Sequence, residues 1–138
     1  MWSLQYERKK LRQAFFDAWT AAGDFDVLLT PVHVLPAVQH GTFKKISFTC
    51  SFTLVFNVLD LPAGVLPVTS VDAARDEYTT PARGLLERTA RGCYNLAEQH
   101  GLPLGVQVVG RPFKDETVLR AMRIIENLVQ FKPRPVEL

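Results

Sequence analysis

Apolar residues recur along this chain at two spacings, which separate the expected helices from the expected strands. Over residues 4–22, an apolar stripe recurs at helical spacing and is expected to form the inner face of a helix: Leu4, Leu11, Phe15, Ala18 and Ala22. Short apolar runs rich in valine and leucine occupy residues 26–30, 64–71 and 104–109. Runs of this length and composition, bounded by glycine and proline, predict three short buried strands.

The remaining segments between the strands predict further helices. Residues 47–59 are rich in β-branched and aromatic side chains, which favours a strand, but a spacing of four between apolar positions permits a helix. Of the two, we prefer a buried helix that ends before Pro62. Thr80–Pro81 predicts a helix start, because a hydroxyl cap precedes a proline in the first turn, and Gly101 is its expected stop. Asp115–Glu116 begins a last helix, where carboxylates suit the exposed N–H groups.

The order of helix, strand, helix, strand, helix, strand and helix predicts an α/β fold with helices layered on a sheet. A chain of 138 residues is long enough for one domain with a core. However, strands that are apolar on both faces normally lie inside a larger sheet that is covered on both sides. We therefore expect residues 1–138 to be one incomplete domain with no separate domain within it.

Composition narrows the class of protein. Hydrophobic residues make up 47% and charged residues 22% of the chain, which is typical of a globular protein, and a net charge of +2 gives no reason to expect a nucleic-acid partner. No apolar run approaches the roughly 18 residues that span a bilayer, and the first ten residues lack the apolar core of a signal peptide. Cys50 and Cys93 are expected to be reduced, as in an intracellular protein.

The residue inventory offers no metal or cofactor site. His33, His40 and His100 are far apart, and neither a CxxC nor an HExxH spacing occurs. In residues 101–110 the strand follows the first glycine, which is the reverse of a strand–glycine–helix phosphate site. We expect no metal ion and no cofactor.

The serines, cysteines and lysines of the sequence also indicate no catalytic residue. None of the four serines lies in a glycine-flanked elbow, and neither cysteine has a neighbouring histidine. Lys44–Lys45 is a pair of lysines of the kind that is usually solvated. The chain therefore shows apolar, strand-forming segments without an activated nucleophile.

Several spaced motifs nevertheless point to a family. They are DVLLTP at residues 26–31, LPAGVLPVT at 61–69 and GLPLGVQVVG at 101–110, with Asn57 between the first two. In this order they resemble the C-terminal part of the amidase signature family of serine amidases. SFTLVFN at 51–57 is most similar to the fatty acid amide hydrolase branch. The resemblance implies the C-terminal part of a mixed β-sheet core covered by helices.

The resemblance also implies an activity. Members hydrolyse amides with a Ser-Ser-Lys triad carried in a Gly/Ser-rich region upstream of the part that matches here. This chain has no Gly–Gly, Gly–Ser or Ser–Ser step, so no catalytic residue is carried over and the chain alone is expected to be inactive. For the full-length protein, the resemblance implies a fatty acyl amide substrate and allows for membrane association and a homodimer.

Three residues are candidates for substrate binding. By register with the family, Ser47, Cys50 and Leu54 match positions that line the acyl pocket, and their spacing places them on one helical face. Ordinary core packing is the alternative for each of them. Residues 72–100 depart from the family pattern. Two other functions stay open: a non-catalytic lipid-binding or interaction module derived from an amidase, and a fragment of an amidase that acts on small polar amides.

Overall fold

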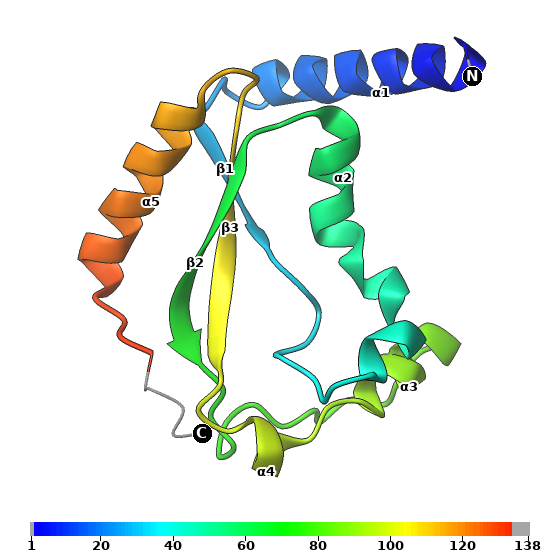
Figure 1. The fold of residues 1–138 in the computed structure, drawn as a ribbon, viewed down its shortest axis with the longest axis vertical. Helices are drawn as coiled ribbons and strands as arrows, with labels where there is room; N and C mark the ends of the chain where they lie inside the picture. The colour runs from blue at the N-terminus through cyan, green and yellow to red at the C-terminus, as the bar shows by residue number, and fades with distance from the viewer. Residues whose placement is uncertain (1, 134–138) are drawn as a thin grey trace.

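A computed structural model of the chain describes residues 2–133, and Figure 1 shows a small sheet with helices on both sides. The helix α5 lies along one side of the sheet and α2 lies on the other, with α1 crossing one end. The elements in chain order are α1 (Trp2–Ala21), β1 (Val27–Pro31), the 3₁₀ turns η1 (Thr42–Lys45) and η2 (Ser47–Cys50), α2 (Ser51–Leu59), β2 (Ala63–Ser70), α3 (Leu85–Arg91), α4 (Leu96–Gln99), β3 (Pro103–Gly110) and α5 (Asp115–Val129). The α/β class and the three strands predicted from the sequence are confirmed.

The sheet has the strand order β1-β3-β2, and both pairings are antiparallel. The two motif segments at 61–69 and 101–110 therefore lie side by side, with Gly64 opposite Val108. The register shifts between Pro67 and Thr69, which is a local irregularity of the kind that bends a strand. Because proline has no N–H to donate, its place in β2 suits a strand at the edge of this sheet.

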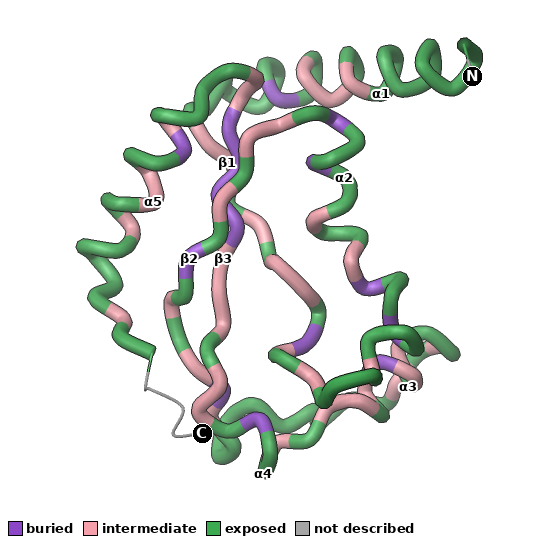
Figure 2. The backbone as a smooth tube through the Cα atoms, in the orientation of Figure 1, coloured by how far each residue is buried: buried purple, intermediate pink, exposed green. Residues whose placement is uncertain are grey.

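Two apolar clusters cover the two faces of the sheet. On the α5 side, Val108 packs with Val118 of α5, and on the α2 side Val109 packs with Phe56 and Leu59 of α2. These positions alternate along β3 because successive side chains of a strand point to opposite faces. Figure 2 shows buried residues in the sheet, on α2 and around α3 and α4, whereas most of the helical surface is exposed.

The helix predicted over residues 4–22 is confirmed as α1, but its buried face differs from the prediction. Trp19 is only 3% exposed, and its Nε1 atom donates a hydrogen bond to the carbonyl oxygen of Phe25 at 2.8 Å. Leu4 and Leu11, which the periodicity placed on the inner face, are exposed. The helix extends beyond α2 and the sheet (Figure 1), so only its last turns have a surface to pack against.

The helical interpretation of residues 47–59 is also confirmed, as η2 followed by α2. The helix ends at Asp60, which adopts a left-handed conformation with φ of 57°, two residues before Pro62. Its buried residues are Phe56 and Leu59, while Leu54, on the stripe read from the sequence, is 52% exposed.

The helix expected to start at Thr80–Pro81 was placed wrongly. The structure has two short helices: α3, which begins at Leu85, and α4, which is capped by the Asn95 side chain accepting from the N–H of Ala97. Thr80 does not cap a helix, because its side-chain and carbonyl oxygens both accept from the Arg91 guanidinium. Leu85, the first residue of α3, is 79% exposed.

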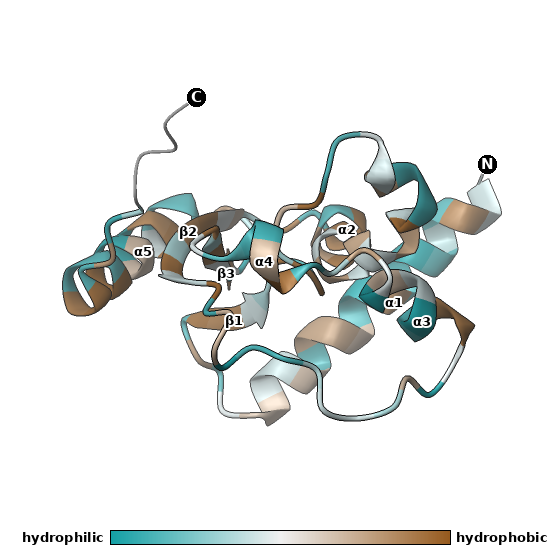
Figure 3. Cartoon of the chain, turned by 90° about the horizontal axis from the view of Figure 1, so that it is seen from below, coloured by the Kyte–Doolittle hydropathy of each residue, from teal (hydrophilic) through white to brown (hydrophobic). Residues whose placement is uncertain are grey.

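The chain exposes more surface than a monomer of its size normally does. Its accessible surface is 10389 Å², whereas a globular monomer of 15.5 kDa is expected to expose about 7,200 Å². Figure 3 shows hydrophobic residues on the peripheral helices as well as in the sheet. The difference between the two areas is about 3,000 Å². Among the helices formed by residues 2–133, none has the length and apolar character needed to cross a membrane.

Candidate functional site

The three predicted substrate-binding residues lie on η2 and α2. Ser47 is exposed, Cys50 is half-buried at the junction of the two helices, and Leu54 is 52% exposed. The 3₁₀ turn keeps Ser47 and Cys50 on one side, because residues three apart eclipse each other in that helix. Nothing in the structure tests whether these residues contact a substrate, so their role stays a prediction.

Next to this segment lies an apolar cavity of about 240 Å³. One wall comes from η2 and the start of α2, and the opposite wall comes from α3 and from the polar connection before it. The residues that line it are Val34, Phe48, Thr49, Ser51, Tyr78, Leu86, Glu87, Ala90 and Arg91. Residues 72–100, which depart from the family pattern, therefore supply a second wall of this cavity.

An ion pair closes the α3 side of this cavity. Arg91 donates to Glu87 Oε1 at 2.5 Å, and its guanidinium lies 4.5 Å from the centre of the Tyr78 ring. Glu87 Oε2 also accepts from the backbone N–H of Arg83 at 2.7 Å. That backbone hydrogen bond, followed by the one from Arg91, holds the pKa of Glu87 below its usual value. Since Glu87 and Arg91 form an ion pair with each other, the cavity offers an incoming molecule mainly apolar surface.

A buried hydroxyl–imidazole pair lies at the base of η2. Thr49 Oγ1 and His33 Nε2 are 2.5 Å apart, an arrangement that would suit a nucleophile and its base. However, Thr49 Oγ1 also lies within hydrogen-bond distance of the carbonyl of Ile46, and the N–H of Leu35 donates to His33 Nδ1. Because Thr49 Oγ1 donates its single proton to the Ile46 carbonyl oxygen, it can only accept from His33 Nε2, and the imidazole does not act as its base. Thr49 is 2% exposed, so the pair holds the loop to η2.

Sequence reasoning missed this pair because sixteen positions separate its members. No local motif marks either residue. Only the fold of the 32–46 segment brings the imidazole beneath η2.

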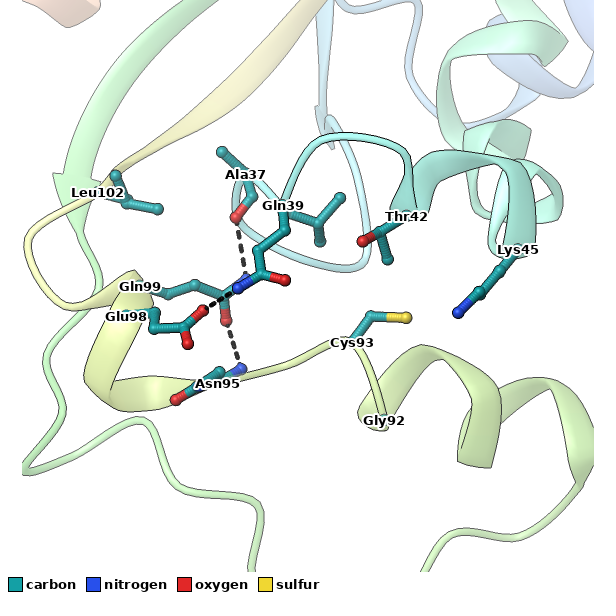
Figure 4. A pocket seen from close by; sticks show the side chains of 11 residues that line it. Ala37, Gln39, Thr42, Lys45, Gly92, Cys93, Asn95, Glu98, Gln99 and Leu102 are labelled. Atoms are coloured by element: carbon teal, nitrogen blue, oxygen red, sulfur yellow. Dashed lines mark hydrogen bonds between the residues drawn. The ribbon is translucent and has the colours of Figure 1, made fainter.

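A second, more polar cavity of about 530 Å³ lies where residues 37–45 meet α4 (Figure 4). Gln99 Nε2 donates to the carbonyl of Ala37 at 2.9 Å, and Gln39 Nε2 donates to Glu98 Oε2 at 2.7 Å. Cys93 and Lys45 point toward the same space. The amide and carboxylate groups that line this cavity form hydrogen bonds between residues 37–45 and α4.

Within residues 2–133, the structure brings together no activated nucleophile. Ser3, Ser47 and Ser51 are exposed on helical segments, and Ser70 ends β2. Cys50 and Cys93 are free thiols. The described part of the chain also contains no cluster of three or more side chains suited to hold a metal ion. The geometry supplies an apolar wall and a sheet, and no group in this part is arranged to attack an amide carbonyl.

Comparison with known proteins identifies the family of the chain. The family model described as "Amidase" matches residues 1–119. The chain is 36% identical to the "Fatty-acid amide hydrolase 1" of Sus scrofa over 131 residues, which is 94% of this chain and 22% of that protein. It is 33% identical to the "Fatty acid amide hydrolase 1" of Caenorhabditis elegans, covering 96% of this chain and 25% of the relative. An "Acetamidase" of Aspergillus oryzae is 26% identical, covering 94% of this chain and 24% of that protein.

A solved structure agrees with these sequence matches. A "Fatty acid amide hydrolase" superimposes with a TM-score of 0.80 at 25% identity, over 94% of this chain and 23% of that chain. The chain thus spans about a quarter of the length of the relatives it matches. The order of the motifs, the antiparallel sheet and these matches agree, and the chain belongs to the amidase family, as a segment of an amidase signature fold similar to that of the fatty acid amide hydrolases.

Proposed function

We propose that this chain is the C-terminal scaffold of a serine amidase that hydrolyses fatty acyl amides, and that the chain alone is inactive. Its share of the enzyme is the sheet and one wall of the acyl-binding pocket. The observation that carries the proposal is the exposed apolar surface of η2 and α2, a segment that includes no activated nucleophile. The similarity to proteins named fatty acid amide hydrolases supports the choice of substrate.

The physical logic of an acyl pocket fits these side chains. A fatty acyl chain gains about 0.8 kcal/mol for each methylene removed from water, without needing any charged partner. Phe48, Phe52 and Leu54 expose apolar surface along the same helical segment. Attack on the amide carbonyl also requires preorganised N–H donors and a nucleophile. In this proposal the rest of the amidase domain supplies both.

Substrate profiling of the full-length protein tests the proposal. We expect oleamide to be hydrolysed in preference to acetamide, and we expect no turnover by the isolated chain. Leu54→Asp should raise the KM for oleamide at least tenfold, because it places a charge on the proposed acyl wall. Leu119→Asp is the matched control, since Leu119 is 64% exposed on α5, on the other side of the sheet. Equal effects of the two substitutions on KM would contradict the assignment of Leu54 to the acyl-binding wall.

A second candidate is an amidase for small polar amides, and the similarity to an acetamidase favours it. Preference for acetamide over oleamide by the full-length protein would replace the lipid assignment with this one. Turnover of oleamide by the isolated chain would contradict the proposed inactivity. If Ser47→Ala or Ser51→Ala abolished that turnover, the nucleophile would lie within this chain. Membrane association and a homodimer stay predictions for the full-length protein.

A further inference from the structure

The 3₁₀ turn η2, which begins the proposed acyl-binding wall, is held only weakly by its own hydrogen bonds. It is four residues long, and its N-cap, Ile46, contributes no side-chain hydrogen bond. Hydrogen bonds in a 3₁₀ turn have poorer geometry than those of an α-helix. The stretch that leads into it, residues 32–46, contains the short turn η1 and otherwise loop. The place of η2 in the fold must therefore come from contacts with other elements.

Two contacts at the base of η2 supply this support. Ile46 is fully buried and packs with Leu35 and Ala90, which holds the start of the turn by apolar contact. Thr49 is the buried residue of η2 itself, at 2% exposed, and its Oγ1 lies 2.5 Å from Nε2 of His33. Because His33 lies two residues after the end of β1, this hydrogen bond ties η2 to the sheet.

The hydrogen bonds of this pair have defined directions. The N–H of Leu35 donates to His33 Nδ1 at 3.2 Å, and Thr49 Oγ1 donates to the carbonyl oxygen of Ile46 at 2.5 Å. His33 Nε2 therefore carries a proton and donates it to Thr49. A buried polar pair with every atom satisfied favours one geometry, and loss of either member leaves the other without its partner.

The pair lies directly behind the predicted substrate-binding residues. Residues three apart eclipse each other in a 3₁₀ turn, so Ser47 and Cys50 share one face of η2 while Thr49 lies on another. Leu54 follows on α2, which continues from η2 without a break. In so short a turn, a shift of Thr49 away from His33 moves Ser47 and Cys50 with it.

We propose that His33 and Thr49 are positioning residues that fix the acyl-binding wall against the sheet. The inference rests on the proposed function, because it requires that Ser47, Cys50 and Leu54 contact the acyl chain. Neither member of the pair touches the substrate, since Thr49 is buried and His33 lies beneath η2. A displaced wall loses contact with the acyl chain equally in the ground state and in the transition state, so the effect falls on KM and not on kcat.

The test uses variants of the full-length protein that differ in whether a donor reaches Thr49. His33→Gln places an amide nitrogen near the position of imidazole Nε2, whereas His33→Asn is too short to reach. We expect His33→Asn and Thr49→Val to raise the KM for oleamide about fivefold or more, with kcat within about twofold of wild type. His33→Gln and Thr49→Ser should restore KM to within about twofold. The KM for acetamide should not change, because this substrate has no long chain to reach the wall.

A matched control and a double variant separate positioning from a loss of stability. His40→Asn changes an exposed histidine of the same loop and should leave both KM values unchanged. The double variant His33→Asn with Thr49→Val should raise KM no more than either single variant, because both remove one hydrogen bond. If His33→Asn does not fold, Thr49→Val, which keeps the shape of the side chain, gives the same comparison with Thr49→Ser.

The outcomes also separate this inference from the proposed function. Equal changes in KM for oleamide and acetamide, equal KM values for the Asn and Gln variants of His33, or additive effects in the double variant would overturn the positioning role. If Leu54→Asp raises the KM for oleamide and neither His33→Asn nor Thr49→Val does, the positioning role alone fails. If Leu54→Asp leaves that KM unchanged, the acyl-binding wall fails, and the positioning role fails with it.

Discussion

Replacing Gly110 with alanine tests how closely α5 packs on the sheet. Gly110 is the last residue of β3, and a Cβ atom built there would overlap Cγ2 of Val118 in α5. Val118 is 3% exposed, and a β-branched side chain in a helix has essentially one rotamer, so it has no alternative position to take. The carbonyl oxygen of Lys114, 3.4 Å from the same Cβ position, restricts the site further.

The expected loss of stability follows from two opposing effects. Overpacking of a filled core typically costs about 1–3 kcal/mol, and Gly110 should lie near the upper end because its neighbours are rigid. Loss of glycine's freedom in the unfolded chain offsets about 0.4–1 kcal/mol. We therefore expect Gly110→Ala to lower the free energy of unfolding by about 2 kcal/mol.

Gly64→Ala is the matched control. A Cβ atom at Gly64 would overlap the thioether of Met122, but methionine is flexible and can move its end aside. The expected change is therefore within about 0.5 kcal/mol of zero, since a small strain is offset by the unfolded-state effect. The two glycines suffer similar overlap, so only the stiffness of the neighbour separates them.

Urea unfolding followed by circular dichroism measures both changes. A double-mutant cycle with Val118→Ala should show a coupling of at least about 1 kcal/mol, because removing the methyl groups relieves the overlap. Equal losses for Gly110→Ala and Gly64→Ala would refute the reasoning, as would a cycle without coupling.

Two further predictions concern α1 and α3. Trp19→Phe should cost about 1–3 kcal/mol in a urea titration, because it removes a hydrogen bond to Phe25 and buried ring area, while Trp2→Phe, at a 92% exposed position, should cost almost nothing. The lowered pKa of Glu87 means that its contribution to stability is present above its ordinary value of 4.5 and is lost as the pH falls through the lowered value. The stability difference between wild type and Glu87→Gln should therefore be largest near neutral pH and shrink below about pH 4.5; a difference that stays constant down to pH 2 would contradict this.

The sequence predicted the strands and most helices because their apolar patterns are local. The inner faces of the helices were predicted less well, because periodicity shows which residues are apolar and not which have something to pack against. Leu11 and Leu54 fit a helical stripe but are exposed, while Trp19 is buried through a contact with the following loop.

The failure at Thr80 has a related cause. A hydroxyl followed by proline is a valid helix start in isolation, but the hydroxyl of Thr80 accepts from Arg91, the last residue of α3. Contacts of this kind depend on tertiary structure. The same holds for the candidate site, where no local stretch of sequence signals the His33–Thr49 pair.

The central claim is that this chain provides the scaffold of an amidase and not its nucleophile. A fluorophosphonate probe labels activated serines covalently, and mass spectrometry then locates the labelled residue. We expect the isolated chain to remain unlabelled, and the full-length protein to be labelled at a serine outside residues 2–133. Labelling of Ser47 or Ser51 in the isolated chain, abolished by replacing that serine with alanine, would contradict the account.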